Sequence, residues 1–289
     1  MPDHARAEFA TPGTDGVLGG PVPEAFPAGT QHTDQDHVTP PIRRVLDLYC
    51  RATAGLAGVF VLTVIDAKTG AVRPQQFAIT KIKEMADEAV ARGDLANVFF
   101  GPVILKASLP VTARGKVDDI VAVLGLVIDD DGDTGRRAVL PPSIQPSLEV
   151  MTSEIPCINR HLHFIFKRPL PVAAAQKLAE LLHRKCGGDH GTGDVAHVWR
   201  LPGTKNHPNQ KKIDGRGRPV DPQSVVLTGG SMQRIDAEEL RRPLTQCRTC
   251  TSPVRVATVM RAATAVDRLT EMRSSRGCRD TSSTSSKPR

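Results

Sequence analysis

The chain has 289 residues, of which 39% are hydrophobic and 24% charged, a composition typical of a folded globular protein. Its net charge of +7 arises at the C-terminal end: residues 241–289 hold 11 Lys and Arg against 3 Asp and Glu, whereas residues 1–240 hold 27 against 28. Overall basicity therefore says nothing about nucleic-acid binding by the core. The longest apolar runs are too short to span a bilayer, so we expect a cytoplasmic protein without membrane contact.

The first elements follow a polar arm. Residues 1–40 contain six prolines and five glycines and cannot bury enough apolar surface to order themselves, so we predict a disordered arm there. A helical repeat of apolar residues follows from residue 42. Two strands joined by a turn at Asp66–Gly70 come next, and then a helix with Thr80 as N-cap and Gly93 at its end.

The rest of the chain alternates short strands with fewer helices. We expect strands near residues 96–107, 123–128, 146–152, 160–171, 195–200 and 223–229, an amphipathic helix over 172–186 that stops at glycine, and a helix capped by Asp236. Strands and helices are interspersed without regular alternation. This favours an α+β fold with a mixed, mostly antiparallel sheet and flanking helices.

The predicted folded domain covers residues 41–242. Residues 243–289 form a basic, Ser/Thr/Arg-rich tail for which we expect little fixed structure, either as a functional extension or as a remnant of truncation. Cys247 and Cys250 have the spacing of zinc ligands, but no second pair stands nearby. We interpret them as incidental thiols.

A cluster of carboxylates follows the strand in "VLGLVIDDDGDTG", residues 123–135. Side chains alternate along a strand, so Asp129 and Asp131 share one face and Asp130 lies on the other. Two like charges at the end of a buried strand repel each other unless a cation lies between them. The pattern therefore predicts a cation site at Asp129 and Asp131.

Two further segments supply candidate polar groups. "NRHLHFIF" places His161 and His163 on one face of a strand, and the glycine-rich "GGDHGTGDVAHVW" offers Asp189 and Asp194 as candidates for a third carboxylate. This glycine-rich loop lacks the Lys-Ser/Thr ending of a P-loop, which argues against an ATPase.

A third segment, "WRLPGTKNHPNQKK", is locally basic. It brings Arg200, Lys205, Lys211 and Lys212 close together in sequence. Arginine grips phosphate in two places and lysine acts as a point charge, so a phosphate-binding site and a solvated basic turn both fit this pattern.

In chain order, "LVIDDD", "NRHLHFIF" and "RLPGTKN" resemble the three motifs of the archaeo-eukaryotic primase superfamily, most closely the RepB-like primases of plasmids and phages. In that superfamily hydrophobic residues precede Asp-x-Asp, a histidine opens a strand, and an acidic residue stands shortly before Arg-Leu-Pro-Gly-Thr-x-Asn. The resemblance covers about residues 40–240, and "RLPGTKN" is its most specific part.

The resemblance implies a primase-like catalytic core in residues 41–242. By position, Asp129, Asp131 and Asp194 would be catalytic carboxylates that hold Mg²⁺ or Mn²⁺. The motif histidine would contact nucleotide phosphates. We favour His163 because it directly precedes "FIF", and His161 remains the alternative.

On the nucleotide-binding side, the resemblance implies roles for His163, Arg200, Lys205 and Asn206 with the incoming nucleoside triphosphate. The family often has Lys two residues after the motif asparagine, whereas this chain has Pro208, so Lys211 or Lys212 would have to substitute.

The implied function is a metal-dependent DNA primase or primase-polymerase of a plasmid or phage, which makes primers on single-stranded DNA by nucleotidyl transfer. Two metal ions about 4 Å apart would activate the attacking 3′ hydroxyl and stabilise the leaving pyrophosphate. The sequence contains no Walker motif, so a replicative helicase would act in trans. Two alternatives remain: a non-catalytic replication-initiator domain that binds DNA, and a metal-dependent phosphodiesterase.

Overall fold

The structure, a computed structural model, describes residues 40–246 apart from 190 and 192. The predictions for the N-terminal arm, for the tail beyond residue 246 and for Cys247 and Cys250 lie outside the described residues.

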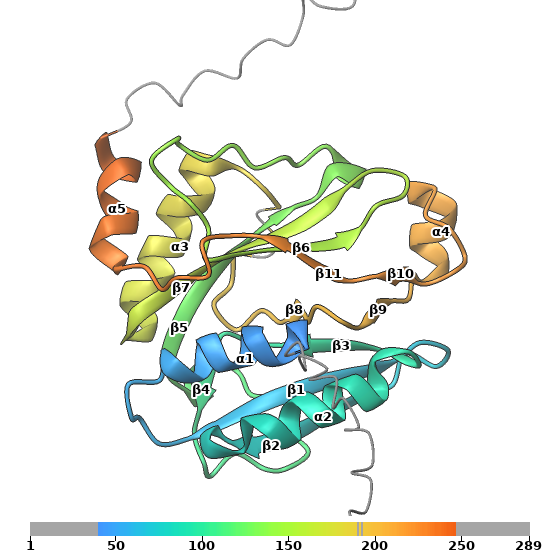
Figure 1. Cartoon of the computed structure of the whole chain (residues 1–289), viewed down its shortest axis with the longest axis horizontal. Coiled ribbons are helices and arrows are strands. Elements are labelled where there is room, and N and C mark those ends of the chain that lie inside the picture. The colour runs from blue at the N-terminus through green and yellow to red at the C-terminus, as the bar shows by residue number, and fades with distance from the viewer. Residues whose placement is uncertain (1–39, 190, 192, 247–289) are drawn as a thin grey trace, which may run out of the picture. The chain divides into compact units, whose positions relative to one another are not determined.

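Most of the expected helices and strands are present, whereas the helix Gln210–Arg216 and the short strand Lys205–Asn206 were not predicted, and the strand predicted over 195–200 is confined to Trp199–Arg200 (Figure 1). The α-helices are α1 (Pro41–Arg51), α2 (Ile82–Gly93), α3 (Val172–Cys186), α4 (Gln210–Arg216) and α5 (Ala237–Gln246). The strands are β1 (Val59–Asp66), β2 (Val72–Ala78), β3 (Ala96–Phe100), β4 (Val103–Leu105), β5 (Ile120–Asp130), β6 (Leu148–Ser153), β7 (Asn159–Leu170), β8 (Trp199–Arg200), β9 (Lys205–Asn206), β10 (Gln223–Ser224) and β11 (Val226–Gly229).

Nine strands form one sheet in the order β11-β6-β7-β5-β4-β1-β3-β8, with β2 paired to β1. The ladders between these strands are antiparallel, and β9 and β10 make a separate antiparallel pair. The α+β fold with a mostly antiparallel sheet is confirmed. Within this sheet, β5 lies between β4 and β7, which places the carboxylates at its end among neighbouring strands.

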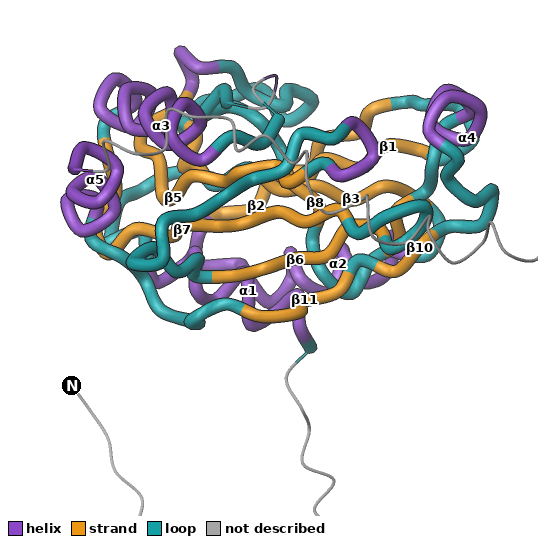
Figure 2. The backbone as a smooth tube through the Cα atoms, turned by 90° about the horizontal axis from the view of Figure 1, so that it is seen from above, coloured by secondary structure: helices purple, strands orange, loops and turns teal. Residues whose placement is uncertain are grey.

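Helices cover both faces of the sheet (Figure 2). Helices α1 and α2 pack on one face and α3 and α5 on the other, so residues 40–246, as far as they are described, form two hydrophobic cores. Strand β1 shows why: Phe60 and Leu62 point into the first core, and Val61 points into the second. Full burial of a side chain of this size contributes about 1.5–3 kcal/mol to the free energy of folding.

Several element boundaries differ from those expected. Thr80 lies within a short 3₁₀ turn, Ile79–Lys81, and α2 begins after Lys81 without a side-chain cap, so the predicted Thr80 cap is wrong. The single strand predicted over residues 96–107 is divided between β3 and β4, because Gly101 and Pro102 interrupt the ladder.

The last helix continues past the predicted domain end. Asp236 caps α5 as expected, because its Oδ1 accepts a hydrogen bond of 3.0 Å from the Glu238 amide. The helix runs to Gln246 since Leu240 and Leu244, four residues apart, are both completely buried against α3 and β7. Residue 242 thus lies inside a helix.

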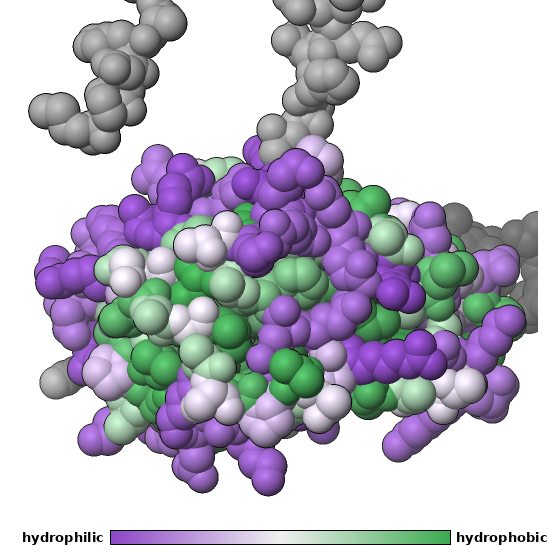
Figure 3. Space-filling view, turned by 90° about the horizontal axis from the view of Figure 1, so that it is seen from below, coloured by the Kyte–Doolittle hydropathy of each residue, from purple (hydrophilic) through white to green (hydrophobic). Residues whose placement is uncertain are grey.

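The surface mixes residue types. Figure 3 shows one face on which hydrophobic residues lie among hydrophilic ones, and Leu95, Val111 and Val220 are the most exposed large hydrophobic residues among those described. None of the helices in the described part of the chain has the length and apolar character needed to cross a bilayer.

Candidate active site

The end of β5 separates its three consecutive carboxylates, as the strand alternation predicted. Asp129 and Asp131 line one cavity. Asp130 lies on the opposite side, where its Oδ2 accepts hydrogen bonds from Arg160 at 3.0 Å and from Arg137 at 3.3 Å. Its Oδ1 accepts from the Ala138 amide at 2.9 Å, so Asp130 is held by structural contacts.

The cavity beside Asp129 and Asp131 has a volume of about 170 Å³ and a strongly polar lining. It is lined by three carboxylates, here called the acidic side, and by four Lys and Arg side chains, here called the basic side, and the two meet at the Asp131–Arg216 ion pair. The lining residues are Asp129, Asp131, Thr152, Asn159, His161, Asp189, Arg200, Asn206, Lys212, Arg216 and Arg218. A ligand that presents both negative phosphates and a positive counter-ion would match this division of charge.

The carboxylates of the acidic side lie close enough to repel one another. Burial raises the pKa of Asp129 to about 7, with a further contribution from the negative charges of Asp131 and Asp189. Asp131 Oδ2 pairs with Arg216 at 3.1 Å, while its buried Oδ1 has no hydrogen-bond partner among the described residues. Both features fit a bound cation, because a cation would relieve the repulsion and occupy the free oxygen.

The described residues hold no group of three or more His, Cys, Asp or Glu side chains close enough to bind a metal ion by themselves. Magnesium is often held by one or two carboxylates together with substrate phosphates and water. Asp129 and Asp131 therefore fit a divalent ion that binds together with a phosphorylated substrate.

The third carboxylate beside the cavity is Asp189, and Asp194 lies elsewhere. At Gly188, φ is +87°, and a Cβ atom would lie 2.9 Å from the Asp129 carbonyl oxygen, so glycine lets the loop approach β5 closely. The next amide, that of Asp189, donates to the same carbonyl oxygen at 2.9 Å. Asp194 is exposed, does not line the cavity, and accepts a hydrogen bond from the Ala196 amide.

The two strand histidines have different surroundings. His161 lines the cavity, and its Nε2 lies 3.9 Å from Asp129 Oδ1. His163 does not line it; its Nδ1 lies 2.8 Å from the Tyr49 hydroxyl. Of the two, the structure places His161 where a ligand in the cavity would touch it.

The "RLPGTKN" segment contributes two of its predicted residues to the cavity. Arg200 is anchored by a 2.6 Å hydrogen bond to Asn97 and stacks over Phe99. Burial, followed by the charge of Arg218, lowers the pKa of Arg200 to about 9. Asn206 is buried, and its Oδ1 has no hydrogen-bond partner among the described residues.

Lys205 does not reach the cavity. Its Nζ lies 3.0 Å from Ser224 Oγ, across the β9–β10 pair, and the residue is not part of the cavity lining. The nucleotide-binding roles of Lys205 and His163, and the metal-binding role of Asp194, remain predictions that their positions do not favour.

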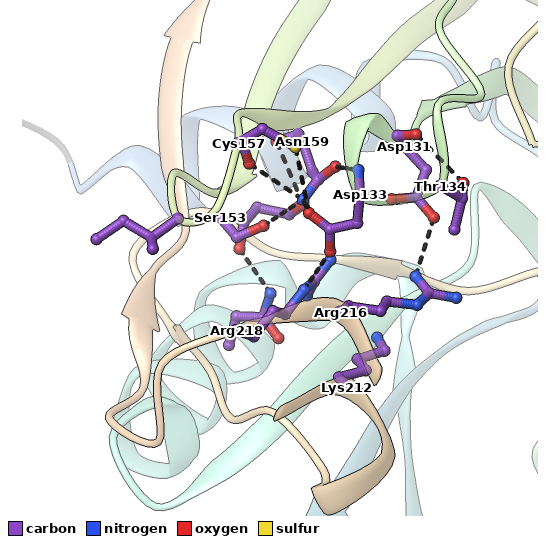
Figure 4. A network of polar contacts seen from close by, with 12 residues as sticks. Asp131, Asp133, Thr134, Ser153, Cys157, Asn159, Lys212, Arg216 and Arg218 are labelled. Carbon is purple, nitrogen blue, oxygen red and sulfur yellow. Dashed lines mark hydrogen bonds and ion pairs between the residues drawn. The ribbon is translucent and has the colours of Figure 1, made fainter. Parts of the chain in front are cut away.

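Helix α4 and Arg218 just after its end supply part of the basic side, and of these residues the sequence analysis named only Lys212. Lys212 and Arg216 on this helix, and Arg218 just after it, all line the cavity (Figure 4). Burial, then the charges of Arg200, Arg218 and Arg216, lowers the pKa of Lys212 to about 8. Asn209 caps the helix through its Oδ1, and this capping residue followed by a glycine at 217 was the available sequence signal.

Arg218 anchors the end of this basic segment. Its Nε lies 2.5 Å from Asp133 Oδ2, and the side chains are 6% and 0% exposed. Asn159 Nδ2 also donates to Asp133, at 2.7 Å, and Cys157 Sγ lies 3.4 Å away (Figure 4). A buried, hydrogen-bonded ion pair thus links α4 to the turn that follows β5.

Neither the family models nor the curated proteins compared with this sequence contain a match. Among solved structures, the chain is similar to the primase-polymerase (AEP) domain of cyanophage S-2L, with 18% identity over 71% of this chain and 96% of that one, and a TM-score of 0.46. It is also similar to primase RepB′, with 16% identity over 71% of this chain and 62% of that one, at a TM-score of 0.44. The catalytic domain of primase RepB′ in complex with initiator DNA gives 16% identity over 71% and 94%, at a TM-score of 0.41. At such identities and TM-scores the chemistry has to be judged from the side chains in the cavity.

Proposed function

We propose that this chain is a metal-dependent nucleotidyltransferase, a DNA primase or primase-polymerase that joins nucleotides on a single-stranded DNA template. The main support is the single cavity in which Asp129 and Asp131 face the basic side chains of Arg200, Lys212 and Arg216. Transfer of a nucleotide needs both parts, because the triphosphate requires cations and the metal requires carboxylates.

Asp129 and Asp131 are the residues that would hold Mg²⁺ or Mn²⁺. The raised pKa of Asp129 and the free buried oxygen of Asp131 support this assignment. When bound, the metal supplies positive charge where the attacking and leaving oxygens become negative. We assign Asp189 a supporting electrostatic role, because it adds negative charge beside Asp129.

The basic side binds the triphosphate of the incoming nucleotide. Arg200 is oriented by Asn97 and Phe99, so its guanidinium is held in place before the ligand enters. Lys212 adds a point charge, which replaces the lysine that the family often has at the position of Pro208. His161 contacts phosphate from the β7 side.

The template is held through its phosphates. The sequence has one Trp and one Tyr, and Tyr49 is completely buried, so stacking of bases on aromatic side chains is not the main binding mode. The RepB-like motifs are the basis for proposing a plasmid or phage setting, with a helicase acting in trans.

Primer synthesis tests the proposal directly. The full chain is incubated with single-stranded DNA, labelled nucleotides and Mg²⁺ or Mn²⁺, beside Asp129→Ala plus Asp131→Ala. Asp87→Ala plus Asp221→Ala removes two exposed carboxylates and serves as the charge-matched control. We expect products from the wild type and the control, and loss of at least about 100-fold in the cavity variant.

Other outcomes separate the alternatives. Degradation of DNA without added nucleotides would favour the phosphodiesterase. DNA binding that survives in the cavity variant, with no products from folded wild type under either metal, would favour the non-catalytic initiator. Either result overturns the proposed transfer reaction.

A further inference from the structure

A buried hydrogen bond lies behind the cavity, between two residues that do not line it. Tyr49 on α1 and His163 on β7 are 0% and 3% exposed, and Tyr49 Oη lies 2.8 Å from His163 Nδ1. The two residues are 114 positions apart in the chain. A buried polar pair of this kind costs desolvation energy, so a purely apolar contact would fill the same space more simply.

The protonation of this pair follows from its surroundings. Burial lowers the pKa of His163 to about 3 and raises that of Tyr49, so the ring is neutral and the hydroxyl keeps its proton. If Tyr49 donates, the Nε2–H of His163 is the one group of this pair that lacks a partner among residues 40–246 as described. If His163 donates instead, both the Tyr49 O–H and His163 Nε2 lack one among the described residues. The first arrangement is favoured because it leaves fewer buried groups unpaired.

His161, like His163, has a ring nitrogen without a hydrogen-bond partner among the described residues. Its buried Nδ1 has no hydrogen-bond partner among the described residues, and neither has Nε2 of His163. The two rings share one face of β7, with centroids 6.1 Å apart. A water molecule between the two rings would accept from an N–H on one ring and donate to a bare nitrogen on the other.

We propose that Tyr49 and His163 are positioning residues that fix the tautomer of His161. Tyr49 donates to His163 Nδ1, and His163 Nε2–H donates through one water molecule to His161 Nδ1. His161 therefore carries its proton on Nε2, the nitrogen that lies 3.9 Å from Asp129 Oδ1 beside the cavity. Trp199, whose ring packs edge-on against His161 with centroids 4.9 Å apart, holds the imidazole in that orientation.

The consequence for chemistry rests on the proposed function. With its proton on Nε2, neutral His161 offers the cavity a hydrogen-bond donor, which suits a phosphate oxygen. The opposite tautomer would present a lone pair and repel the same oxygen. Tyr49 and His163 would thus act on the substrate without touching it.

The imidazole tautomers can be measured without substrate. Full-length protein labelled with ¹⁵N in its histidines is studied by long-range ¹H–¹⁵N NMR at pH 7.5, with His161→Gln and His163→Gln variants to assign the signals. We expect both wild-type rings to carry their proton on Nε2. A wild-type His161 with its proton on Nδ1, or with both nitrogens protonated, overturns the proposal.

Tyr49→Phe removes the hydroxyl alone and is expected to shift the tautomer ratio of His161 about tenfold toward Nδ1–H, as loss of one hydrogen bond allows. Phe100→Leu is the matched control, because Phe100 packs on the Tyr49 ring with centroids 5.1 Å apart while the hydroxyl is kept. An unchanged ratio in Tyr49→Phe, or an equal shift in Phe100→Leu, contradicts the proposed relay, that is, the hydrogen-bond chain from Tyr49 through His163 to His161. If the tautomers behave as expected while the wild type makes no primers, the relay stands and the proposed function fails.

Discussion

Asp129 lies directly opposite His161 in the β5–β7 ladder, with 3.9 Å between Asp129 Oδ1 and His161 Nε2. The two side chains are near neighbours without a hydrogen bond at this distance. Burial raises the pKa of the carboxyl group and lowers that of the imidazole, so both residues favour their neutral forms. The charge on this side of the cavity therefore depends on what binds there.

Asp129→Asn is expected to stabilise the metal-free protein at alkaline pH. The pKa of Asp129 is about 7 in the folded chain against an ordinary value of 3.8. The folded state thus binds a proton more tightly than the unfolded state, and this contribution is lost as pH rises from about 4 to about 7. Urea denaturation should show a gain of the order of 1–4 kcal/mol for the variant at pH 8 and little gain at pH 4.5. An equal difference at both pH values would show that Asp129 does not titrate in this window.

Divalent ions should make the wild type more stable than the Asp129→Asn variant. Mg²⁺ or Mn²⁺ competes with the proton for Asp129 and relieves its repulsion with Asp131, so ions at millimolar concentration should raise the melting temperature of the wild type at pH 7.5. Chelation should remove the gain. Asp129→Asn plus Asp131→Asn should show no such response, and NaCl at matched ionic strength controls for screening. A wild-type melting temperature that changes with neither metal would argue against a metal site at Asp129 and Asp131.

Asp189→Asn and Asp194→Asn should differ in activity. Asp189 lines the cavity and raises the pKa of Asp129, whereas Asp194 is exposed outside it. We expect the first variant to lose primer synthesis by about 10-fold or more and the second to stay within about twofold of wild type. Equal Tm values would show that folding is not the cause. The reverse ranking would restore Asp194, the carboxylate favoured by the motif, as the third acidic residue.

Lys212→Ala should weaken nucleotide binding. Lys212 lines the cavity, while Lys211 on the same helix is exposed and provides the matched control. We expect KM for the nucleotide to rise about 10-fold for Lys212→Ala, with little change for Lys211→Ala, because one phosphate contact is lost. The pKa of Lys212 is about 8, so the wild-type KM should also rise as pH passes that value. A KM that responds equally to both variants would remove Lys212 from the triphosphate site.

Asp133→Asn should destabilise the fold. Asp133 and Arg218 form a buried ion pair, and loss of one charge leaves the other buried without compensation, at a cost of about 3–5 kcal/mol. Arg168→Gln is the control, because the Arg168–Asp236 pair is largely exposed on the arginine side and should contribute less than about 1 kcal/mol. Chemical denaturation measures both. Similar small losses would mean that Arg218 is not the anchor of α4.

Local sequence patterns predicted the sheet and one side of the site. Hydrophobic runs and period-two alternation placed β5 and β7 correctly, and the alternation alone separated Asp130 from Asp129 and Asp131. These features depend on the backbone geometry of single strands, which neighbouring residues in the sequence determine.

The parts that the sequence did not predict depend on contacts between distant segments. Spacing from the motif arginine favoured Asp194, but the close approach of Gly188 to β5 brings Asp189 to the cavity instead. His163 contacts Tyr49, 114 residues earlier in the chain, whereas His161 lines the cavity. Arg216 reaches Asp131 across 85 residues, and no local pattern encodes that ion pair.

Because side chains alternate at the end of β5, the site depends on whether an odd or an even number of residues is inserted into the strand. An insertion of one residue within the strand would turn Asp130 toward the cavity and send its neighbours toward Arg137 and Arg160, because successive side chains point to opposite faces. An insertion of two residues would keep the faces and shift the carboxylates along the strand by about 7 Å. A sequence alignment that is shifted by one position in this segment would still match aspartate to aspartate. It would nevertheless pair residues that face the cavity with residues on the opposite face of the strand.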